Sequence, residues 1–485
     1  MILTAMDWWT PAPGALLEWH PSPASAARAL DAPTTPGPLT FLQENHLRTC
    51  HATAAAGGEH NAYLGAATEV DGPIDRAALS RALRIFTLRH EGLRTWFRID
   101  TTQITRMLVE PDAVEFEAHN VGDYTTETEF RRYIHARLGA EAISTSWPGF
   151  AFGAISRPDG FTMYYGCDHA LSDGASQALV LDEIAELYEA ERNATAPPPH
   201  VSAATGSFLD YASLQNNVAA RFTDESPEVI EWVDIFTSHG ATMPRFPLDL
   251  GLGPGEAAPV RPIEFDLLDA AGANRFEDVC RRSGAGVMGG IYAAAAITEL
   301  ELTGRTDYFA IAVLGTRSAE FALSQGWFCN FAPVAFDVTS AGSFTEVVAA
   351  AHAGHVRAKR LSSVPLPVVI TALLRSGVDP RDVAGTPNLL SYLDFRRFPG
   401  DGRPAHDRGV IFTGEGRTSN ASMWFNRDRR RLYLGLQTPD TATAQLEIKR
   451  YLQRLWEVID TVAREGDYAV ASTPVEELAL ARHHD

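Results

Sequence analysis

The chain has 485 residues, of which 45% are hydrophobic and 21% are charged, and its formal net charge at pH 7 is -20. A single hydrophobic core stops growing at about 250–300 residues, so we expect two large lobes or several domains. The excess of acidic residues argues against binding to nucleic acid or to an anionic membrane, because both select for clustered Lys and Arg.

The first 40 residues contain seven prolines and three tryptophans. We expect little regular structure in this arm, because proline removes a backbone hydrogen-bond donor. Trp8, Trp9 and Trp19 are costly to leave in water, so the arm should wrap onto the body of the protein instead of forming a disordered tail. The start of the chain has no basic segment and no continuous apolar segment of the secretory type, which predicts a cytoplasmic protein.

Helices and strands alternate through the rest of the first half. Asp75 suits the N-cap of a helix that runs to His90, with apolar residues at helical spacing. Residues 93–99 alternate like a strand, and residues 161–168 have the composition of a second strand. An amphipathic helix is predicted to follow from residue 174 to about residue 192.

The second half repeats this mixture after a Pro- and Gly-rich boundary at residues 244–262. Because both halves mix the two element types, we predict an α/β sandwich lobe from each. The most apolar run, 286–298, is too short to cross a bilayer, so we expect a buried helix and no transmembrane segment. Helices are predicted at 271–283, 286–302, 344–361 and 444–465, and strands at 308–314, 332–338 and 432–437.

Signals for several other functions are absent or fail on context. Residues 284–289 match GxGxxG, but a predicted helix precedes them, whereas a dinucleotide-binding turn follows a strand. The four cysteines form no CxxC pair, so we expect free thiols and neither a zinc site nor a disulfide framework. The sequence also has no GxSxG elbow, Walker loop or HExxH helix. We therefore expect no metal and no resident cofactor.

The sharpest chemical signal is the segment His169-Ala170-Leu171-Ser172-Asp173-Gly174, an HxxxDG motif between a predicted strand and a predicted helix. Such a loop holds a side chain rigidly while it leaves that side chain accessible. The unperturbed pKa of histidine suits proton transfer near neutral pH. The motif alone is also compatible with a buried core histidine, so its context decides the interpretation.

That context resembles the condensation-domain superfamily. Residues 89–97, Arg-His-Glu-Gly-Leu-Arg-Thr-Trp-Phe, are similar to the RHExLRTxF segment of nonribosomal-peptide condensation domains. Residues 40–44, 208–212 and 326–330 are similar to three further segments of that superfamily, in the same order. The Trp- and Pro-rich opening resembles actinobacterial polyketide-associated acyltransferases, which esterify glycolipids and polyketide lipids.

The resemblance implies an architecture. We expect two lobes that resemble chloramphenicol acetyltransferase, arranged as a V-shaped pseudo-dimer with a central tunnel. Residues 1–40 would form the N-terminal arm, residues 41–245 the lobe with HxxxDG, and residues 246–485 the C-terminal lobe. We expect a monomer.

The resemblance also implies roles for individual residues. His169 would be the general base that activates the acceptor, and Gly174 would allow pantetheine to approach the backbone closely. Asp173 would point away from substrate toward Arg317, which would support the loop. Trp327 and Asn330 are candidates for the tunnel wall, although ordinary strand positions explain them as well.

Asp168 departs from the superfamily pattern. Condensation domains usually have a second histidine immediately before the catalytic one, and here Asp168 takes that place. Strand alternation should direct Asp168 away from the side that His169 faces, so we expect little effect on catalysis.

The arginines at 427 and 429–431 suit either the phosphates of coenzyme A or an acidic carrier protein, or else form an ordinary exposed turn.

We therefore predict an acyltransferase. It would move an acyl group from a pantetheine thioester, on coenzyme A or an acyl carrier protein, to a hydroxyl of a lipid, sugar or polyketide. The alternatives are a stand-alone condensation enzyme that forms an amide on an amine acceptor, and a catalytically silent scaffold that docks a carrier protein.

Overall fold

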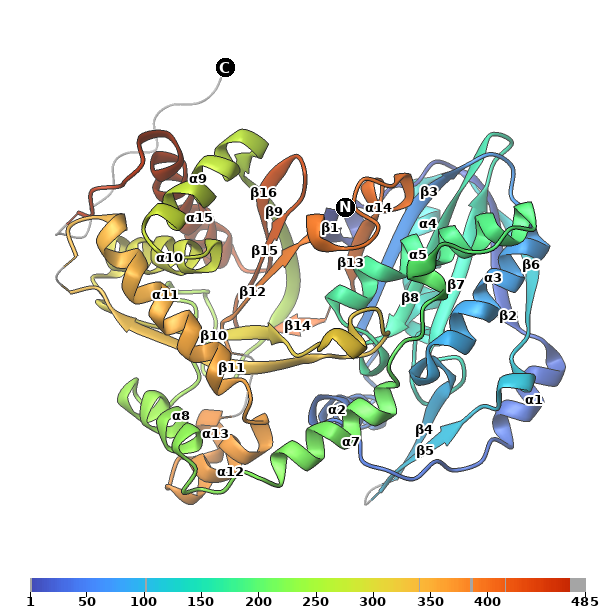
Figure 1. Ribbon diagram of the computed structural model, residues 1–485, viewed down its shortest axis with the longest axis horizontal. Helices are drawn as coiled ribbons and strands as arrows, with labels where there is room; N and C mark the ends of the chain where they lie inside the picture. Colours follow the sequence, from blue (N-terminus) through green and yellow to red (C-terminus); the bar gives the residue numbers. More distant parts are fainter. Residues whose placement is uncertain (1, 101–102, 340, 384–386, 415, 472–485) are drawn as a thin grey trace. The chain divides into compact units, whose positions relative to one another are not determined.

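The computed structural model describes residues 2–100, 103–339, 341–383, 387–414 and 416–471 (Figure 1). The chain forms two compact units, and each unit collects segments that lie far apart in the sequence. Segments 315–329 and 394–416 join unit 1, whereas the sequence analysis assigned both to the C-terminal lobe. Unit 1 comprises Met1–Arg221, Gly315–Cys329 and Asp394–Gly416, and unit 2 comprises Phe222–Leu314, Asn330–Leu393 and Arg417–Asp485.

Unit 1 is built on a seven-stranded sheet with the order β1-β13-β3-β8-β7-β2-β6. Strand β1 pairs with β13 in parallel, and the other neighbouring strands are antiparallel. The strands are β1 (Ile2–Ala5), β2 (Gly14–Pro21), β3 (Tyr63–Asp71), β6 (Phe116–Tyr124), β7 (Phe150–Ser156), β8 (Gly160–Asp168) and β13 (Val410–Thr413). A separate hairpin joins β4 (Thr95–Ile99) to β5 (Ile104–Leu108).

Strand β8 lies inside this sheet and every one of its residues is buried. Successive residues of a strand point to opposite faces of the sheet, and helices cover β8 on both faces. Tyr164 packs in a cluster with α4 (Glu127–Glu141), whereas Tyr165 contacts Phe86 of α3 (Arg76–Arg89). The strand is therefore held on both sides where it delivers the HxxxDG motif.

Helices α3 and α5 (Gly174–Asn193) pack together in unit 1. The predicted cap of α3 is confirmed, since the Asp75 side chain accepts a hydrogen bond from the amide of Ala78. The other helices of the unit are α1 (Pro23–Leu30), α2 (Phe41–Ala55), α6 (Pro199–Ser202), α7 (Phe208–Ala219) and α14 (Pro404–Asp407). Short 3-10 turns are η1 (Met6–Trp8), η2 (Glu91–Arg94), η3 (Pro111–Ala113), η4 (His169–Leu171), η5 (Ala319–Phe321) and η6 (Phe395–Arg397).

The N-terminal arm is more regular than its prolines predict. It contains β1, η1, β2 and α1, and β2 lies inside the sheet between β6 and β7. Pro21 ends β2 and Pro23 opens α1, and at such ends a missing backbone donor costs little. The predicted packing is confirmed for Trp9 and Trp19, which are 7% and 3% exposed, but not for Trp8, which is 52% exposed.

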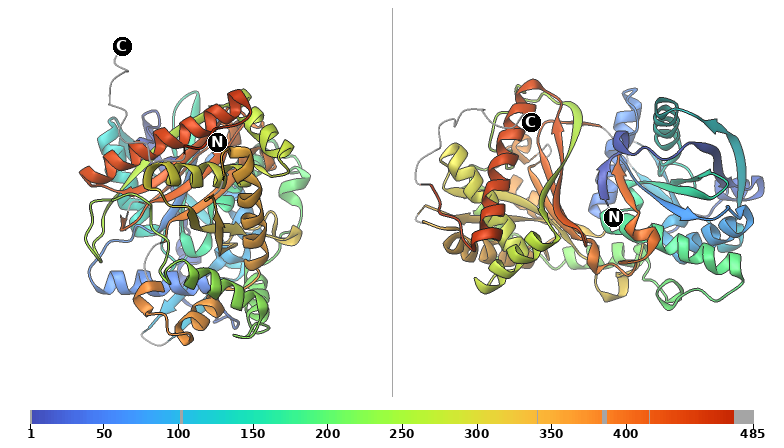
Figure 2. Two further views of the ribbon diagram at one scale, coloured as in Figure 1. Left: turned by 90° about the vertical axis from the view of Figure 1, so that its left-hand side faces the viewer. Right: turned by 90° about the horizontal axis from the view of Figure 1, so that it is seen from above.

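Unit 2 is built on a second seven-stranded sheet with the order β11-β10-β12-β15-β16-β9-β14. Figures 1 and 2 show α9, α10, α11 and α15 on one face of it, where they enclose the hydrophobic core of the unit. The strands are β9 (Ala258–Asp269), β10 (Asp307–Gly315), β11 (Cys329–Asp337), β12 (Leu389–Asp394), β14 (Arg417–Thr418), β15 (Ser422–Arg427) and β16 (Arg431–Pro439). The helices are α8 (Pro227–Ser238), α9 (Ala270–Arg282), α10 (Val287–Thr303), α11 (Phe344–Leu361), α12 (Leu366–Arg375), α13 (Pro380–Val383) and α15 (Ala442–Glu465).

The GxGxxG match covers the turn between α9 and α10 and the first residues of α10, so the prediction that a helix precedes it is confirmed. The apolar run that follows is the buried helix α10, as expected. Among the described residues, no helix is both long enough and apolar enough to cross a membrane.

Candidate active site

The HxxxDG motif lies where the sequence predicts it, between a strand and a helix of unit 1. Strand β8 ends at Asp168, the turn η4 carries His169, and α5 begins at Gly174. The backbone amide of His169 donates to the carbonyl of Ala62, 3.1 Å away. The backbone on both sides of the histidine is thus held by regular structure.

The His169 ring lies against Trp327. Their centroids are 3.8 Å apart with planes at 33°, and the His46 ring lies 6.1 Å from the His169 ring. The Nδ1 atom of His169 is buried without a hydrogen-bond partner. Burial, together with the positive charge of His46, lowers the pKa of His169 to about 4. The imidazole is therefore neutral near pH 7.

The predicted pair between Asp173 and Arg317 is present. Arg317 Nη2 lies 2.7 Å from Asp173 Oδ1 and also donates to the Ser176 hydroxyl. The backbone amides of Ser176 and Phe328 donate to the two Asp173 oxygens at 2.7 and 2.9 Å. Burial alone would raise the pKa of Asp173, but the charge of Arg317 and these hydrogen bonds lower it. Both oxygens thus serve the fold of the loop.

Arg317 in turn is anchored to the segment that carries Trp327. Its guanidinium donates to the carbonyls of Phe321 and Ser324 and lies 4.2 Å from the centroid of the Phe328 ring. Phe321 and Phe328 pack with Phe208 and Tyr211 of α7 in one cluster. The family-like segments at 208–212 and 326–330 therefore meet behind the loop.

The family-like segment at 89–97 stabilises the same unit from the side of α5. His90 Nε2 lies 2.9 Å from Glu183 Oε1, and Arg89 Nη1 lies 2.7 Å from the same oxygen. Glu183 belongs to α5, so these contacts tie the end of α3 to the helix that begins at Gly174. The segment supports the position of the motif helix.

The structure also links Asp168 to the site, which the sequence analysis did not foresee. Asp168 Oδ1 lies 2.8 Å from His46 Nε2, and the His46 ring approaches both His169 and Trp327. His46 and Asp168 are 122 residues apart in the chain. No local spacing signals such a pair, because α2 reaches η4 only in the folded unit.

The two tunnel candidates fall in different units. Trp327 belongs to unit 1, and its ring lies against that of His169. Asn330 belongs to unit 2, where its side-chain amide donates to the carbonyls of Ser362 and Val364. These bonds match the alternative interpretation of Asn330 as an ordinary strand residue. A tunnel-wall role for either residue stays a prediction.

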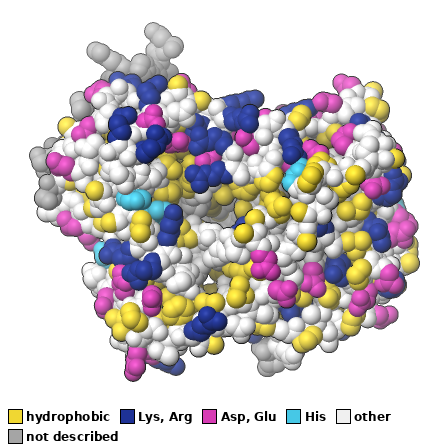
Figure 3. Space-filling model, in the orientation of Figure 1, with side chains coloured by type: hydrophobic (Ala, Val, Ile, Leu, Met, Phe, Trp, Pro, Cys, Tyr) yellow, Lys and Arg dark blue, Asp and Glu magenta, His cyan; other side chains and the backbone are white. Residues whose placement is uncertain are grey.

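The arginines at 427–431 do not form a free basic cluster. Arg427 is 2% exposed and donates to Asn274 Oδ1 at 2.8 Å, and its Nε lies 3.4 Å from Glu277. Arg431 pairs with Glu264 and Asp266. On the face drawn in Figure 3, basic and acidic side chains are interspersed. Arg427 and Arg431 therefore serve the fold of unit 2, which weakens the interpretation of this turn as a phosphate site.

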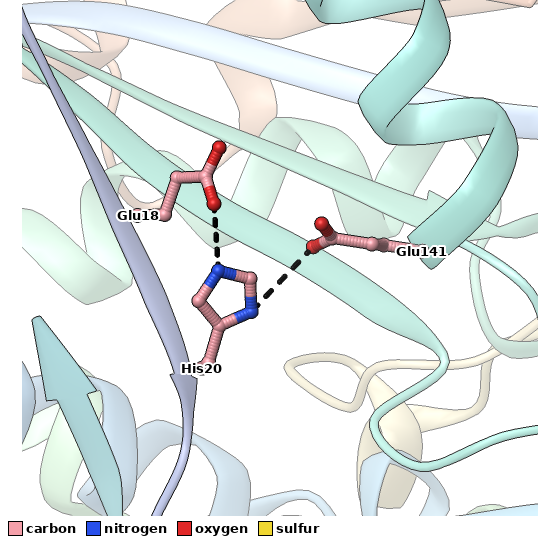
Figure 4. A group of neighbouring side chains, drawn as sticks. All are labelled: Glu18, His20 and Glu141. Carbon is pink, nitrogen blue, oxygen red and sulfur yellow. Dashed lines mark hydrogen bonds and ion pairs between the residues drawn. The ribbon is translucent and has the colours of Figure 1, made fainter. Parts of the chain in front are cut away.

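Among the described residues, two groups bring potential metal ligands close together. In Figure 4, His20 lies between Glu18 and Glu141, with nitrogen-to-oxygen distances of 2.7 and 3.9 Å. Arg137 lies 3.7 Å from Glu18 and 3.3 Å from Glu141, so a guanidinium already pairs with both carboxylates. In the second group, Asp401, His406 and Asp407, the His406 ring lies 3.5 Å from Asp407, which also accepts a hydrogen bond from the amide of Gly402. We assign no metal to either group.

Comparisons with known proteins show the family to which the chain belongs. The family model for the condensation domain matches residues 37–380. The chain is 34% identical over 370 residues to 2'-acyl-2-O-sulfo-trehalose (hydroxy)phthioceranyltransferase PapA1 of Mycobacterium tuberculosis, covering 76% of this chain and 71% of that protein. It is 26% identical over 486 residues to acyltransferase PapA3 of the same species, covering 96% of this chain and 98% of that protein.

Solved structures show the same relationship. The PapA2 acyl transferase superposes with a TM-score of 0.84 at 25% identity and covers 96% of this chain and 100% of its own. The first condensation domain of the CDA synthetase superposes with a TM-score of 0.67 at 21% identity, covering 88% and 97%, which shows the shared fold. The predicted mixed α/β, chloramphenicol-acetyltransferase-like fold class is thus confirmed. The chain belongs to the condensation-domain family, and within it the chain is an acyltransferase of the polyketide-associated type.

Proposed function

We propose that this acyltransferase moves an acyl group from a pantetheine thioester to a hydroxyl of a sugar or lipid, with His169 as the general base. The observation that carries the proposal is the His169 ring, which lies against Trp327 at the end of a fully buried strand and whose Nδ1 atom has no hydrogen-bond partner. PapA1 and PapA2 are named for acyl transfer to sulfated trehalose derivatives, which favours a sulfated sugar as acceptor here.

The neutral ring suits both halves of the reaction. As the acceptor oxygen bonds to the thioester carbonyl, its proton passes to His169, and the carbonyl becomes a tetrahedral intermediate. When the intermediate collapses, the carbon–sulfur bond breaks and the leaving sulfur takes the proton from His169. Because the pKa of His169 is lowered to about 4, the protonated ring is a stronger acid than an ordinary imidazolium and gives up the proton readily. No acyl-enzyme is required, since the acceptor attacks directly.

The residues around His169 would contribute position instead of proton transfer. Asp173 and Arg317 hold the loop through bonds that leave neither Asp173 oxygen free for a ligand. Gly174 opens α5 and has no side chain that would obstruct a pantetheine arm. We assign the donor to the pantetheine class, either coenzyme A or a carrier protein.

The test uses the purified chain with a panel of acyl-coenzyme A donors and acyl carrier proteins, and with trehalose-2-sulfate, trehalose and an amine analogue as acceptors. Thiol release and product mass are recorded together. We expect ester products, and the substitution His169→Ala should lower kcat by at least about 100-fold. His51→Ala, an exposed histidine on α2, is the matched control and should retain full activity. Equal turnover by wild type and His169→Ala would contradict the assignment, and an amide product would favour the condensation alternative.

A further inference from the structure

The Asp168 carboxylate organises the turn that carries His169. It is almost fully buried, and it accepts hydrogen bonds from the backbone amides of Ala170 at 2.7 Å and Ser144 at 3.0 Å. The bond to Ala170 makes Asp168 the N-cap of η4, the turn that begins at His169. Any movement of this carboxylate would therefore tilt the backbone of His169.

The same carboxylate forms an ion pair with His46 of α2. The distance from His46 Nε2 to Asp168 Oδ1 is 2.8 Å, and the two side chains are 9% and 3% exposed. Burial alone would lower the pKa of His46, but the hydrogen bonds and negative charges of Asp168 and, after it, Cys50 raise it to about 10. Burial would raise the pKa of Asp168, and His46 lowers it. At neutral pH the pair consists of an imidazolium and a carboxylate.

The cation of this pair faces the His169 ring. The His46 ring is 6.1 Å from His169 and stands nearly perpendicular to Trp327 at 5.9 Å. Trp327 in turn lies against His169. The three rings thus form one contact group, so that His46 borders the ring that we assign as the base.

Resting on the proposed role of His169, we propose that the buried pair of His46 and Asp168 is a positioning device for that residue. Asp168 fixes the η4 turn through the backbone, and His46 presents a fixed positive charge to the His169 ring. A positive charge close to an imidazole disfavours its protonation, so it keeps the base in the neutral form. Asp168, the acidic member of the pair, stands where the superfamily usually has a second histidine.

The charged groups around these rings come from four parts of unit 1. Helix α2 supplies Cys50, whose sulfur lies 3.5 Å from His46 Nε2, and the loop before β3 supplies His60, 3.6 Å from Asp168. Asp173 and Arg317 form the other ion pair of this loop, and their opposite charges largely cancel. The charge of His46 is therefore the main one that lowers the pKa of His169, after burial itself.

The first experiment needs no substrate. The full chain, labelled with 15N-histidine, is titrated by NMR, and the two rings are assigned with His46→Gln and His169→Gln. We expect the His46 ring to stay protonated to at least about pH 8, and the His169 ring to stay neutral down to about pH 5. In His46→Gln the midpoint of the His169 titration should move to higher pH by at least about one unit. His51→Gln, on the same helix, should leave it unchanged.

The second experiment is kinetic. His46→Gln and Asp168→Asn should each lower kcat about tenfold with little change in KM, and the double variant should lose no more than either one, because both break the same pair. The acid limb of the kcat/KM profile should shift upward in His46→Gln.

An unchanged His169 midpoint in His46→Gln, or wild-type kcat in both single variants, would overturn the inference. A fall in kcat and melting temperature without any shift of the midpoint would reduce the pair to a structural role, and would also overturn it. Wild-type turnover by His169→Ala would instead overturn the proposed function, so the two failures are distinguishable.

Discussion

Two buried ion pairs flank the loop of His169, and they differ in the kind of cation. On one side Asp173 pairs with Arg317, and guanidinium groups are permanent cations in proteins. On the other side Asp168 pairs with His46, an imidazole that can lose its proton. Asp168 accepts a hydrogen bond from the amide of Ala170 in η4, whereas Asp173 accepts from the amides of Ser176 in α5 and of Phe328. The arginine pair is thus a permanent support, whereas the histidine pair couples the loop to pH.

The largest effect should follow from removing the permanent cation. Arg317→Met leaves the Asp173 carboxylate buried without its counter-ion, which should lower the free energy of unfolding by about 3–5 kcal/mol. Urea denaturation measures this loss. Arg375→Met is the matched control, because Arg375 pairs with Asp224 on the surface, where the two side chains are 67% and 44% exposed, and it should change stability little. Similar losses in both variants would contradict the assigned role of Arg317.

The two pairs were not equally predictable from sequence. Asp173 and Arg317 occupy positions that the superfamily pattern marks, and the strand and helix around the motif follow from local composition. His46 and Asp168 carry no such mark, because only the packing of α2 against η4 brings them together. For Arg427 the prediction from the local sequence is wrong. Its neighbouring arginines predict an exposed cluster, yet Arg427 is buried and contacts Asn274 and Glu277 of α9.

The pairing of strands that lie far apart in the chain could not be predicted from the sequence either. Strand β13 inserts between β1 and β3, so the sheet of unit 1 depends on residues 410–413 that sequence analysis assigned to the other lobe. The prolines of the arm wrongly predicted little regular structure for a related reason. A proline destabilises a helix or strand when it stands inside the element, but much less when it stands at the end. Local propensity identifies elements, but it does not say which elements meet.

A second, smaller effect sharpens the contrast between the pairs through pH. The pKa of His46 is raised in the folded state from its ordinary 6.5 to about 10, so its stabilisation is complete below pH 6.5 and is lost as the pH rises through 10. Between pH 7 and pH 9 the lowered pKa of Cys50 acts in the opposite direction, because that thiolate is stabilised by the same imidazolium. The stability of the wild type relative to His46→Gln should therefore fall, by about 1 kcal/mol per pH unit, mainly between pH 9 and pH 10. The depressed pKa of Asp173 acts in the opposite range, since its stabilisation is lost only as the pH falls below the ordinary value of 3.8. Denaturation curves from pH 3 to pH 10 measure both trends, and parallel curves for wild type and His46→Gln above pH 9 would contradict the first.

The smallest expected effect is chemical and does not change the fold. Burial raises the pKa of Cys50, but His46 and His60 outweigh it and lower that pKa to about 7, whereas burial raises the pKa of Cys280 to about 12 and holds Cys167 and Cys329 higher still. Iodoacetamide at pH 7.5 should therefore label Cys50 well before the other three cysteines, as peptide mass spectrometry would show. In His46→Gln the labelling should slow severalfold, because the thiolate loses its neighbouring imidazolium. An unchanged rate in that variant would mean that His46 is not protonated beside the thiol. It would then also contradict the proposal that His46 presents a positive charge to His169.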